Sequence, residues 1–405
     1  MLIQQSIWRK SPVSVSVAKM NNKRPVYLDY QATTPLDPRV YKSMQPYFKE
    51  QFGNPHSHNH TMGWESHAAV EKARKEVAEM ICADANEIVF TSGATEANNL
   101  ALIGIARKSK PEKNRILLSS IEHKCVLEAS RYLSGQGFMI QQLPVDDVGL
   151  VDLSALEDSM DEDVLLVSIM TVNNEIGTIQ PIEEIAKIVH RQNAFFHTDA
   201  AQASVTKRID VVQDDVDLMS LSAHKMYGPK GIGTLYVKNG VERNIEPLFW
   251  GGGQENGLRS GTLPVALCVG FGAAAKILNE HGDEMIVHVK KLRDVFFQQL
   301  SDFKQNVKLI GPDLNNRHVG NLSILFPEYE ATDLLTMLQP NLAASTGAAC
   351  TSGIPEPSHV LRALGLSGDL ADNVIRFSFG QFLSEDDIMR GIKLLRDVVE
   401  RVNAR

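Results

Sequence analysis

Short apolar runs that each end in a polar cluster recur along the chain, and this alternation restricts the folds that it can adopt. The runs and the clusters that follow them are residues 88–90 and 91–96, 116–118 and 119–124, 164–170 and 172–177, 195–197 and 199–202, and 218–221 and 224–225. Helical segments separate these pairs. Continuous apolar strands of this kind are buried on both faces, which is typical of a mainly parallel sheet. Ligands of such sheets bind beyond the carboxyl ends of the strands, so we expect the polar clusters to meet at one edge.

The C-terminal third of the chain follows a different pattern. Its apolar spacing predicts helices at 264–300, 331–337 and 386–402 and strands at 321–326 and 374–379. We therefore predict an α/β fold whose large domain, at 35–281, has a mainly parallel sheet. A smaller α+β domain is expected from 25–34 together with 282–405.

Composition excludes several classes of function. The chain of 405 residues is 43% hydrophobic and 22% charged, which is ordinary for a globular protein with a large core. A net charge of −8 without a broad basic stripe argues against nucleic-acid binding, and no apolar run is long enough to span a bilayer. The four cysteines show no Cys-x-x-Cys spacing, which favours a reducing intracellular compartment.

The N-terminal segment differs from the rest. Arg9, Lys10, Lys19 and several serines precede the first acidic residue, Asp29. A basic, serine-bearing and acid-free segment is typical of an organellar transit peptide, and a disordered extension is the alternative. We expect residues 1–24 to direct the protein to a mitochondrion or a related organelle (hydrogenosome or mitosome), with the cytoplasm as the alternative location.

Lys225 lies in the stretch Ser-Leu-Ser-Ala-His-Lys-Met-Tyr-Gly-Pro-Lys-Gly-Ile-Gly at 220–233. An amine flanked by the hydroxyl of Ser222 and the imidazole of His224, on glycine-rich backbone, suits a Schiff base to an aldehyde cofactor that carries a phosphate. That cofactor would be pyridoxal 5′-phosphate (PLP). The alternative is a surface lysine on a Gly/Pro turn.

Residues at the ends of other predicted strands could hold the rest of this cofactor. Ala94 and Thr95, at a helix N-terminus, could bind the phosphate, although Thr95 could also be a plain cap. Asp199 could keep the pyridine nitrogen protonated and Gln202 could donate to the ring oxygen, unless Asp199 is a helix cap. His123 could lie over the ring and move protons, or it could be a buried structural histidine.

Weaker signals come from other loops. Asn174 is either a ring contact or a turn former, and the Arg-Ser-Gly-Thr sequence that ends at Thr262 is either a phosphate contact across a dimer interface or a linker. The histidines within 56–60 have no cysteine or carboxylate near them at ligand spacing, so we predict no metal site.

Cys350 stands in a loop of small residues, 343–353, where core packing does not explain a thiol. An exposed thiol with a stabilised thiolate would be a nucleophile, and an incidental cysteine is the alternative. Cys268 and Cys82 are expected in the core, whereas Cys125 is ambiguous.

Arg376 is predicted on a strand, on the face opposite the apolar residues 375, 377 and 379. A guanidinium on a rigid strand suits a bidentate hold on a substrate carboxylate. The alternative is a solvated arginine on the open face of a sheet.

Taken together, these motifs resemble the group I cysteine desulfurases of the class V aminotransferase family, PLP enzymes of fold type I. The resemblance spans about 24–401, and the Gln-Ala-Thr-Thr-Pro-Leu-Asp-Pro form of the first motif, at 31–38, is similar to the mitochondrial branch. Its motifs are Leu-Asp-Tyr-Gln-Ala-Thr-Thr-Pro at 28–35, Phe-Thr-Ser-Gly-Ala-Thr-Glu at 90–96, Val-Asn-Asn-Glu-Ile-Gly at 172–177, His-Thr-Asp-Ala-Ala-Gln at 197–202, Ser-Ala-His-Lys-Met-Tyr-Gly-Pro-Lys-Gly at 222–231, Arg-Ser-Gly-Thr at 259–262, and the Cys350 loop with Glu-Pro-Ser-His-Val-Leu-Arg-Ala-Leu-Gly at 356–365.

The resemblance implies a role for each candidate residue. Lys225 would hold PLP and move protons at the substrate Cα, and His123 would stack on the ring. Arg376 would bind the carboxylate of L-cysteine, with Asn174 as a further substrate contact. Cys350 would attack the substrate sulfur. The remaining cofactor contacts implied are Asp199 at the pyridine nitrogen, Gln202 and Asn174 at the ring oxygen, Ala94, Thr95, Ser222 and His224 at the phosphate, and Thr262 at the phosphate from the partner subunit.

The reaction implied is the conversion of L-cysteine to L-alanine, with sulfur left as a persulfide on Cys350 for iron–sulfur cluster assembly. The alternatives are a selenocysteine lyase, an aminotransferase-like enzyme, or a catalytically weak platform in an assembly complex. The resemblance also implies a homodimer, an iron–sulfur scaffold protein and small accessory proteins as partners. Members of this branch dock the scaffold through a Ser-Pro-Leu-Trp tail, which this chain, ending at Arg405, does not contain.

Overall fold

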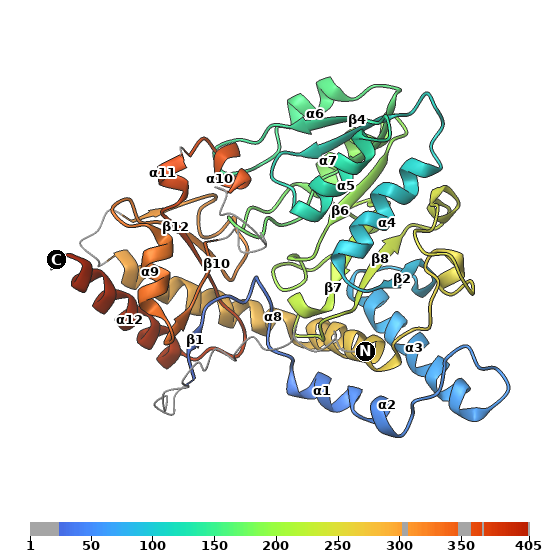
Figure 1. Ribbon diagram of the computed structural model, residues 1–405, viewed down its shortest axis with the longest axis horizontal. Coiled ribbons are helices and arrows are strands. Elements are labelled where there is room, and N and C mark those ends of the chain that lie inside the picture. Colours follow the sequence, from blue (N-terminus) through green and yellow to red (C-terminus); the bar gives the residue numbers. More distant parts are fainter. Residues whose placement is uncertain (1–23, 302–306, 347–357, 367, 404–405) are drawn as a thin grey trace, which may run out of the picture.

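The computed structural model describes residues 24–301, 307–346, 358–366 and 368–403. Cys350 and residues 1–23 of the expected transit peptide lie outside these ranges. The described chain forms a larger part around a central sheet and a smaller part at the other end of the long helix α8 (Figure 1).

The central sheet has seven strands and is mainly parallel, as the alternation of apolar runs predicts. Its order is β2 (Ile88–Thr91), β8 (Gly233–Val237), β7 (Leu218–Ser222), β6 (Phe195–Asp199), β5 (Val164–Ser168), β3 (Arg115–Ser119) and β4 (Met139–Leu143). β8 is antiparallel to both of its neighbours, β2 and β7, and the other pairs are parallel. All strands except β8 therefore point the same way, and their carboxyl ends share one edge.

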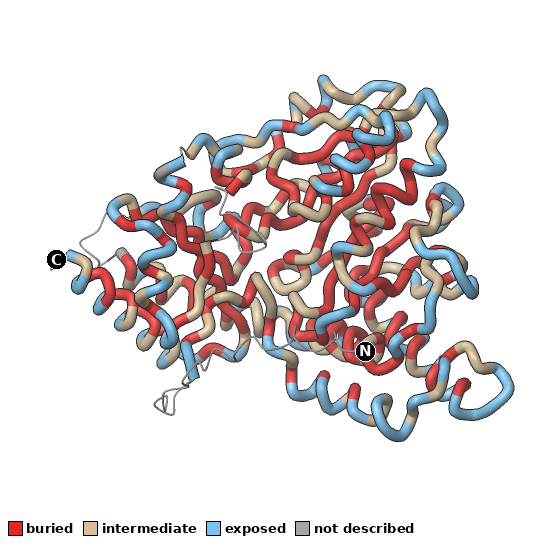
Figure 2. Tube along the Cα trace, viewed as in Figure 1, coloured by how far each residue is buried: buried red, intermediate tan, exposed pale blue. Residues whose placement is uncertain are grey.

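Helices cover both faces of this sheet, and strand β3 shows how the sequence achieves this. Ile116 and Leu118 pack with α4 (Ala94–Arg107) and α5 (Lys124–Ser134), whereas Leu117 faces the core on the other side. That second core is built with α3 (Thr61–Met80), α6 (Leu153–Ser159), α7 (Ile182–His190) and the first half of α8 (Val265–Ser301). The central strands are accordingly buried along nearly their whole length (Figure 2).

The smaller part has a core of its own. Its sheet has the order β12 (Val374–Ser378), β10 (Asn321–Leu325), β9 (Lys308–Leu309), and it is antiparallel. The second half of α8 packs on it together with α9 (Ala331–Leu338) and α12 (Glu385–Asn403). β1 (Val26–Tyr27) pairs with β11 (Leu342–Ala343), which joins the start of the chain to this part. α8 runs without interruption through residue 282, where we expected the small domain to begin.

Short elements complete the described fold. Two helices, α1 (Pro38–Met44) and α2 (Pro46–Lys49), follow one another, because Pro46 cannot continue the hydrogen bonding of α1. The remaining short elements are α10 (His359–Ala363), α11 (Gly368–Ala371) and the 3₁₀ turns Ala85–Glu87, Ala223–Lys225, Val241–Asn244 and Glu255–Gly257.

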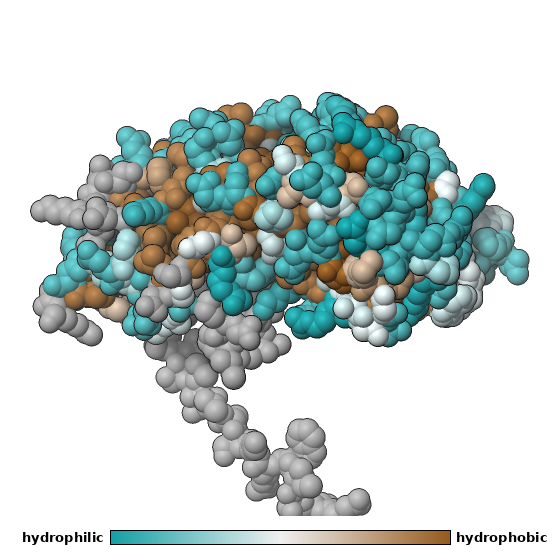
Figure 3. Space-filling view, turned by 90° about the horizontal axis from the view of Figure 1, so that it is seen from above, coloured by the Kyte–Doolittle hydropathy of each residue, from teal (hydrophilic) through white to brown (hydrophobic). Residues whose placement is uncertain are grey.

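Hydrophilic side chains cover most of the face seen in Figure 3, and a hydrophobic area lies in its left half. None of the helices within the described ranges combines the length and the apolar character that crossing a membrane requires.

Candidate active site

A pocket of about 580 Å³ opens at the carboxyl edge of the central sheet. Its walls come from the loops that follow β2, β3, β5, β6 and β7, from residues 31–33, and from β12. The predicted site residues that line it are Ala94, Thr95, His123, Asn174, Asp199, Gln202, Ser222, His224, Lys225 and Arg376. The fold therefore brings together residues that lie as far apart as 94 and 376 in the sequence.

Thr262 does not line this pocket. It is exposed, in the loop before α8, so its predicted phosphate contact in a partner subunit stays a prediction. In the same loop Glu255 accepts hydrogen bonds from Arg74 at 2.8 and 2.7 Å, and Arg259 pairs with Glu96 at 2.8 Å. These contacts fasten the loop to α3 and α4.

Lys225 ends the short turn after β7, and its Nζ atom donates to the backbone oxygens of Gln31 (2.5 Å) and Ala32 (3.0 Å). The same loop is tied to His224, because Thr34 donates to the His224 carbonyl from both its N–H (2.9 Å) and its hydroxyl (3.1 Å). The side chain of Gln202 also donates to the Gln31 carbonyl, at 2.9 Å. Sequence reasoning did not assign this loop to the site. Its contacts with Lys225 come from backbone carbonyls, which no residue type reveals.

Asp199 ends β6 and is almost fully buried. One of its carboxylate oxygens accepts from Asn98 Nδ2 at 2.7 Å, and the other accepts from the Ala201 N–H at 3.0 Å. Asn98 was not predicted as a site residue. The signal that could have identified it is its position on the apolar face of α4, where an amide side chain is unusual.

His123 is the N-cap of α5, and its Nδ1 atom accepts the backbone N–H of Cys125 at 3.2 Å. Burial lowers the pKa of this imidazole below its usual value, while the charge of Asp199 opposes the shift and that of Lys225 adds to it. This shift favours the neutral form of the imidazole, which can act as a base. Burial also raises the pKa of the Cys125 thiol to about 12, so this sulfur keeps its proton.

Ligand atoms of His123, Cys125 and Asp199 lie within 4.8 Å of one another, a spacing that a metal ion could use. A metal ion binds the thiolate, which the raised pKa of Cys125 disfavours. The hydrogen bonds that these side chains accept within the protein account for the arrangement without an ion.

The end of the pocket at the N-terminus of α4 has the features of an anion-binding site. Gly93 precedes α4 with φ of 151° and ψ of 178°, a conformation that is open essentially to glycine alone. A Cβ atom on Gly233 would lie 2.6 Å from Gly93 Cα, so the two backbones meet closely. The first N–H groups of a helix have no partner within the helix, and here Ser222 and His224 lie beside them.

Arg376 is 3% exposed, and its guanidinium is already engaged. One terminal nitrogen donates to the Asp29 carboxylate at 2.7 Å and the other donates to the backbone oxygen of Asn174 at 2.8 Å. The alternative of a solvated arginine is therefore wrong. Asp29 is a partner that sequence reasoning missed.

The described cysteines differ in their surroundings. Cys268 is buried in α8, as predicted, and burial raises its pKa to about 12. Cys82 is only half-buried, because the chain turns sharply there with φ of 59°, so the prediction that it belongs to the core was too strong. Cys125, left ambiguous by the sequence, lines the pocket.

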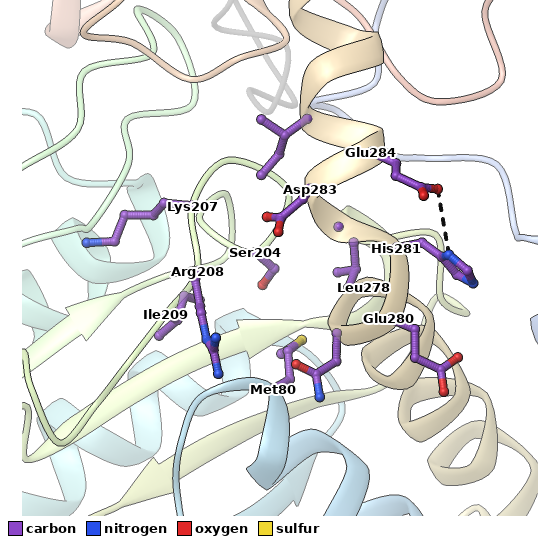
Figure 4. A pocket seen from close by; sticks show the side chains of 13 residues that line it. Met80, Ser204, Lys207, Arg208, Ile209, Leu278, Glu280, His281, Asp283 and Glu284 are labelled. Atoms are coloured by element: carbon purple, nitrogen blue, oxygen red, sulfur yellow. Dashed lines mark ion pairs between the residues drawn. The ribbon is translucent and has the colours of Figure 1, made fainter.

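A second pocket, of about 290 Å³, lies between the C-terminal end of α3, residues 204–209 and the middle of α8 (Figure 4). Charged side chains of both signs surround it, and His281 pairs with Glu284 at 3.8 Å on its rim. It contains none of the predicted site residues, so we assign the chemistry to the pocket at the sheet edge.

The donor set at the sheet edge fits PLP: a lysine amine, a buried carboxylate, a neutral imidazole and an anion cradle surround one cavity. Each group has the chemistry that one part of this cofactor requires. The fit concerns these residues only, and their individual roles stay predictions.

Comparisons with known proteins agree with this reading. The Aminotransferase class-V family model matches residues 26–390. The chain is 48% identical over 380 residues to "Probable cysteine desulfurase, mitochondrial" of Dictyostelium discoideum, covering 94% of this chain and 84% of that protein. It is 47% identical over 378 residues to the cysteine desulfurase IscS of Rickettsia bellii (strain OSU 85-389), covering 93% and 92%.

Solved structures agree as well. A NifS-like protein superposes with a TM-score of 0.87 at 38% identity, covering 94% of this chain and all (100%) of that one. The structure titled "SspA in complex with cysteine" gives a TM-score of 0.78 at 36% identity, covering 88% and 99%. The expected PLP fold type I is thereby confirmed. The chain belongs to the class V aminotransferase family and, within it, to the cysteine desulfurases.

Proposed function

We propose that this protein is a PLP-dependent enzyme that converts L-cysteine to L-alanine and passes the sulfur to Cys350, to supply iron–sulfur cluster assembly. In this reaction the Cβ–S bond of L-cysteine breaks and an S–S bond forms at Cys350. A proton is delivered to Cβ, so alanine leaves and the enzyme holds a persulfide. The observation that carries the proposal is the meeting of Lys225, Asp199, His123 and Arg376 around one pocket.

The residues of this pocket divide the work among them. The Lys225 amine would bind the cofactor aldehyde and move the proton at the substrate Cα. Asp199 would hold the pyridine nitrogen, and the N-terminus of α4 with Ser222 and His224 would hold the phosphate. When bound, PLP supplies an electron sink for the charge that develops at Cα and Cβ.

His123 and Arg376 would act on the substrate side. A neutral His123 can accept a proton from the incoming amino acid and return it later, because burial lowers its pKa and favours the neutral imidazole. Arg376 would bind the substrate carboxylate, with Asn174 and Gln202 beside the ring.

We propose Cys350 as the nucleophile because of its sequence context and the family to which the chain belongs. Two described thiols, Cys125 and Cys268, have pKa values raised to about 12 by burial, which makes both poor nucleophiles at neutral pH. Cys82 does not line the pocket.

The test is to supply L-cysteine with a thiol reductant and to measure alanine and sulfide. Cys350→Ser should lose both products while still binding PLP, and Lys225→Ala should lose the borohydride-reducible adduct with PLP. Cys82→Ser is the matched control and should behave as the wild type. Full activity in Cys350→Ser would exclude Cys350 as the acceptor, and a reducible adduct in Lys225→Ala would exclude Lys225 as the PLP lysine.

We further propose a homodimer in which Thr262 of one copy reaches the pocket of the other. The exposed position of Thr262 supports this arrangement. Mixing Thr262→Ala chains with Lys225→Ala chains tests it: if the contact crosses the interface, each mixed dimer holds one site with both defects and one with neither. Activity should therefore exceed that of either variant alone.

The sulfur acceptor and the location are proposed from the family. An iron–sulfur scaffold protein would take the persulfide sulfur, and small accessory proteins would assist. The location proposed is a mitochondrion or a related organelle, because the N-terminal segment is basic and free of acids. A fluorescent protein fused to residues 1–24 should enter that organelle, and a cytoplasmic signal would contradict the proposal.

A further inference from the structure

We propose that Asn98 and Cys125 are positioning residues: one hydrogen-bonded chain, Asp199–Asn98–Cys125–His123, holds the carboxylate and the imidazole of the pocket and fixes which imidazole nitrogen carries the proton. The inference rests on the proposed function for its kinetic consequence, but its structural content concerns residues of the chain alone. Neither Asn98 nor Cys125 belongs to the set that the sequence assigned to the site.

Asn98 lies at the centre of this chain of contacts. It is fully buried on α4, and its Nδ2 atom donates to Asp199 Oδ2 at 2.7 Å and to Cys125 Sγ at 3.1 Å. Among the described residues, the Asn98 Oδ1 atom is buried and has no hydrogen-bond donor. A flipped amide would turn that oxygen toward the Asp199 carboxylate, where two acceptors would repel, so both contacts fix the orientation.

Cys125 connects the amide to the imidazole. Its sulfur accepts from Asn98 and lies 2.9 Å from His123 Nδ1, and its backbone N–H donates to the same Nδ1 at 3.2 Å. Burial keeps the thiol protonated, so the S–H group can donate to Nδ1.

These contacts decide the tautomer of His123. Because the backbone N–H of Cys125 donates to Nδ1, the lone pair lies on Nδ1 and the proton of the neutral ring lies on Nε2. The thiol, 2.9 Å away, is then placed to donate to the same nitrogen. Nε2 is then the nitrogen left to interact within the pocket. The thiol of Cys125 thus acts through His123 and not as a nucleophile.

The arrangement predicts different consequences for the two positions. Asn98 contacts both Asp199 and Cys125, so its loss should disturb the pyridine-nitrogen end of the pocket as well as His123. Cys125 has no hydrogen bond to Asp199 and reaches it only through Asn98, so its loss should disturb His123 more than the pyridine-nitrogen end of the pocket.

The first test uses the cofactor-free protein and therefore does not depend on the proposed function. Long-range ¹H–¹⁵N NMR of histidine-labelled protein, with the His123 signal assigned by its absence in His123→Gln, should show the Nε2–H tautomer. Cys125→Ala should populate the second tautomer or broaden the signal, because one of the two donors to Nδ1 is lost. Cys125→Ser should restore the wild-type spectrum, and Cys82→Ala is the matched control. An Nδ1–H tautomer in the wild type, or no change in Cys125→Ala, would overturn the proposal.

The second test uses the PLP-bound protein. Asn98→Ala should weaken PLP binding by about tenfold and shift the absorption band of bound PLP, because Asp199 loses a charge-assisted hydrogen bond. Asn98→Ser gives a smaller change of the same sign if Asn98→Ala does not fold. Cys125→Ala should shift the absorption band less than Asn98→Ala does, and it should lower kcat several-fold with little change in KM. Equal effects of the two substitutions on the absorption band would contradict the chain of contacts, whereas a protein without desulfurase activity would contradict only the proposed function.

Discussion

The guanidinium of Arg376 donates to the carboxylate of Asp29 across 2.7 Å, although the two residues are 347 positions apart in the sequence. Asp29 follows β1, at the start of the described chain, and Arg376 lies on β12 near its end. The ion pair holds the arginine against the wall of the pocket, and the Asn174 backbone holds its other terminal nitrogen. An arriving substrate carboxylate would therefore meet a guanidinium that is already oriented.

Arg376→Lys should raise the KM for L-cysteine by about ten- to a hundredfold with a smaller change in kcat, because an ammonium cannot make the planar bidentate contact. Steady-state kinetics of alanine formation measures this. Arg390→Lys is the matched control, since Arg390 pairs with Asp387 on the surface helix α12. An unchanged KM in Arg376→Lys would remove Arg376 from substrate binding.

Glu255→Gln should lower the free energy of unfolding by about 3 kcal/mol, because it removes the buried countercharge of the Arg74 guanidinium and leaves only the more exposed Glu71. Glu255 also accepts the Phe90 N–H at 2.6 Å, next to strand β2, so the loss should loosen the loop that carries Thr262. Urea unfolding measures the change. Glu157→Gln, which breaks an exposed pair with Arg191, should change stability by less than about 0.5 kcal/mol. Similar effects of the two substitutions would show that the buried pair of Arg74 and Glu255 contributes no more to stability than an exposed pair.

The sequence predicted which residues gather at the carboxyl edge of the sheet better than it predicted the hydrogen bonds that they make there. Continuous apolar runs demand burial on both faces, and a parallel sheet then brings the ends of the strands together whatever the connecting loops do. Lys225 and Asp199 follow directly from this rule, because each ends a strand or follows one. Asn98 does not, because it lies inside helix α4 and not at the end of a strand.

Other features could not be predicted because they depend on packing between distant segments. The pairing of Asp29 with Arg376 requires the start of the chain to lie against β12, which no local pattern encodes. The contact of Lys225 with the Gln31 carbonyl is of the same kind. The antiparallel strand β8 was missed because the run of glycines before it indicates a turn, and the apolar run that follows is short.

His190 should make stability depend on pH. Its imidazole lies 2.9 Å from Asp217 and 2.9 Å from Asp215, and the hydrogen bond to Asp217 is the main cause that raises its pKa, against the effect of burial. The folded protein therefore holds the proton more tightly than the unfolded chain. The resulting stabilisation is complete below about pH 6.5, the unfolded pKa, and is lost as the pH rises through the raised folded pKa.

His190→Asn should accordingly cost about 1–2 kcal/mol of unfolding free energy at pH 6 and progressively less at alkaline pH. Urea unfolding of wild type and variant across this range measures the difference. His281→Asn is the control, because its pairing with Glu284 at 3.8 Å is exposed and should contribute little. A difference between wild type and His190→Asn that is constant with pH would exclude the ion pairs as its source.

Thiol labelling should separate the cysteines by their surroundings. Cys125 and Cys268 have pKa values of about 12, so only about one molecule in ten thousand carries either residue as a thiolate at pH 8. Because the thiolate is the reactive form, iodoacetamide should label both residues very slowly in the folded protein. Cys350, as the proposed nucleophile, should be labelled first and with loss of desulfurase activity. Mass spectrometry of the digested protein over time gives the order, and labelling in urea confirms that every thiol is reactive once unfolded. Should Cys125 be labelled before Cys350, and with the same time course as the loss of activity, the nucleophile would be the thiol in the pocket.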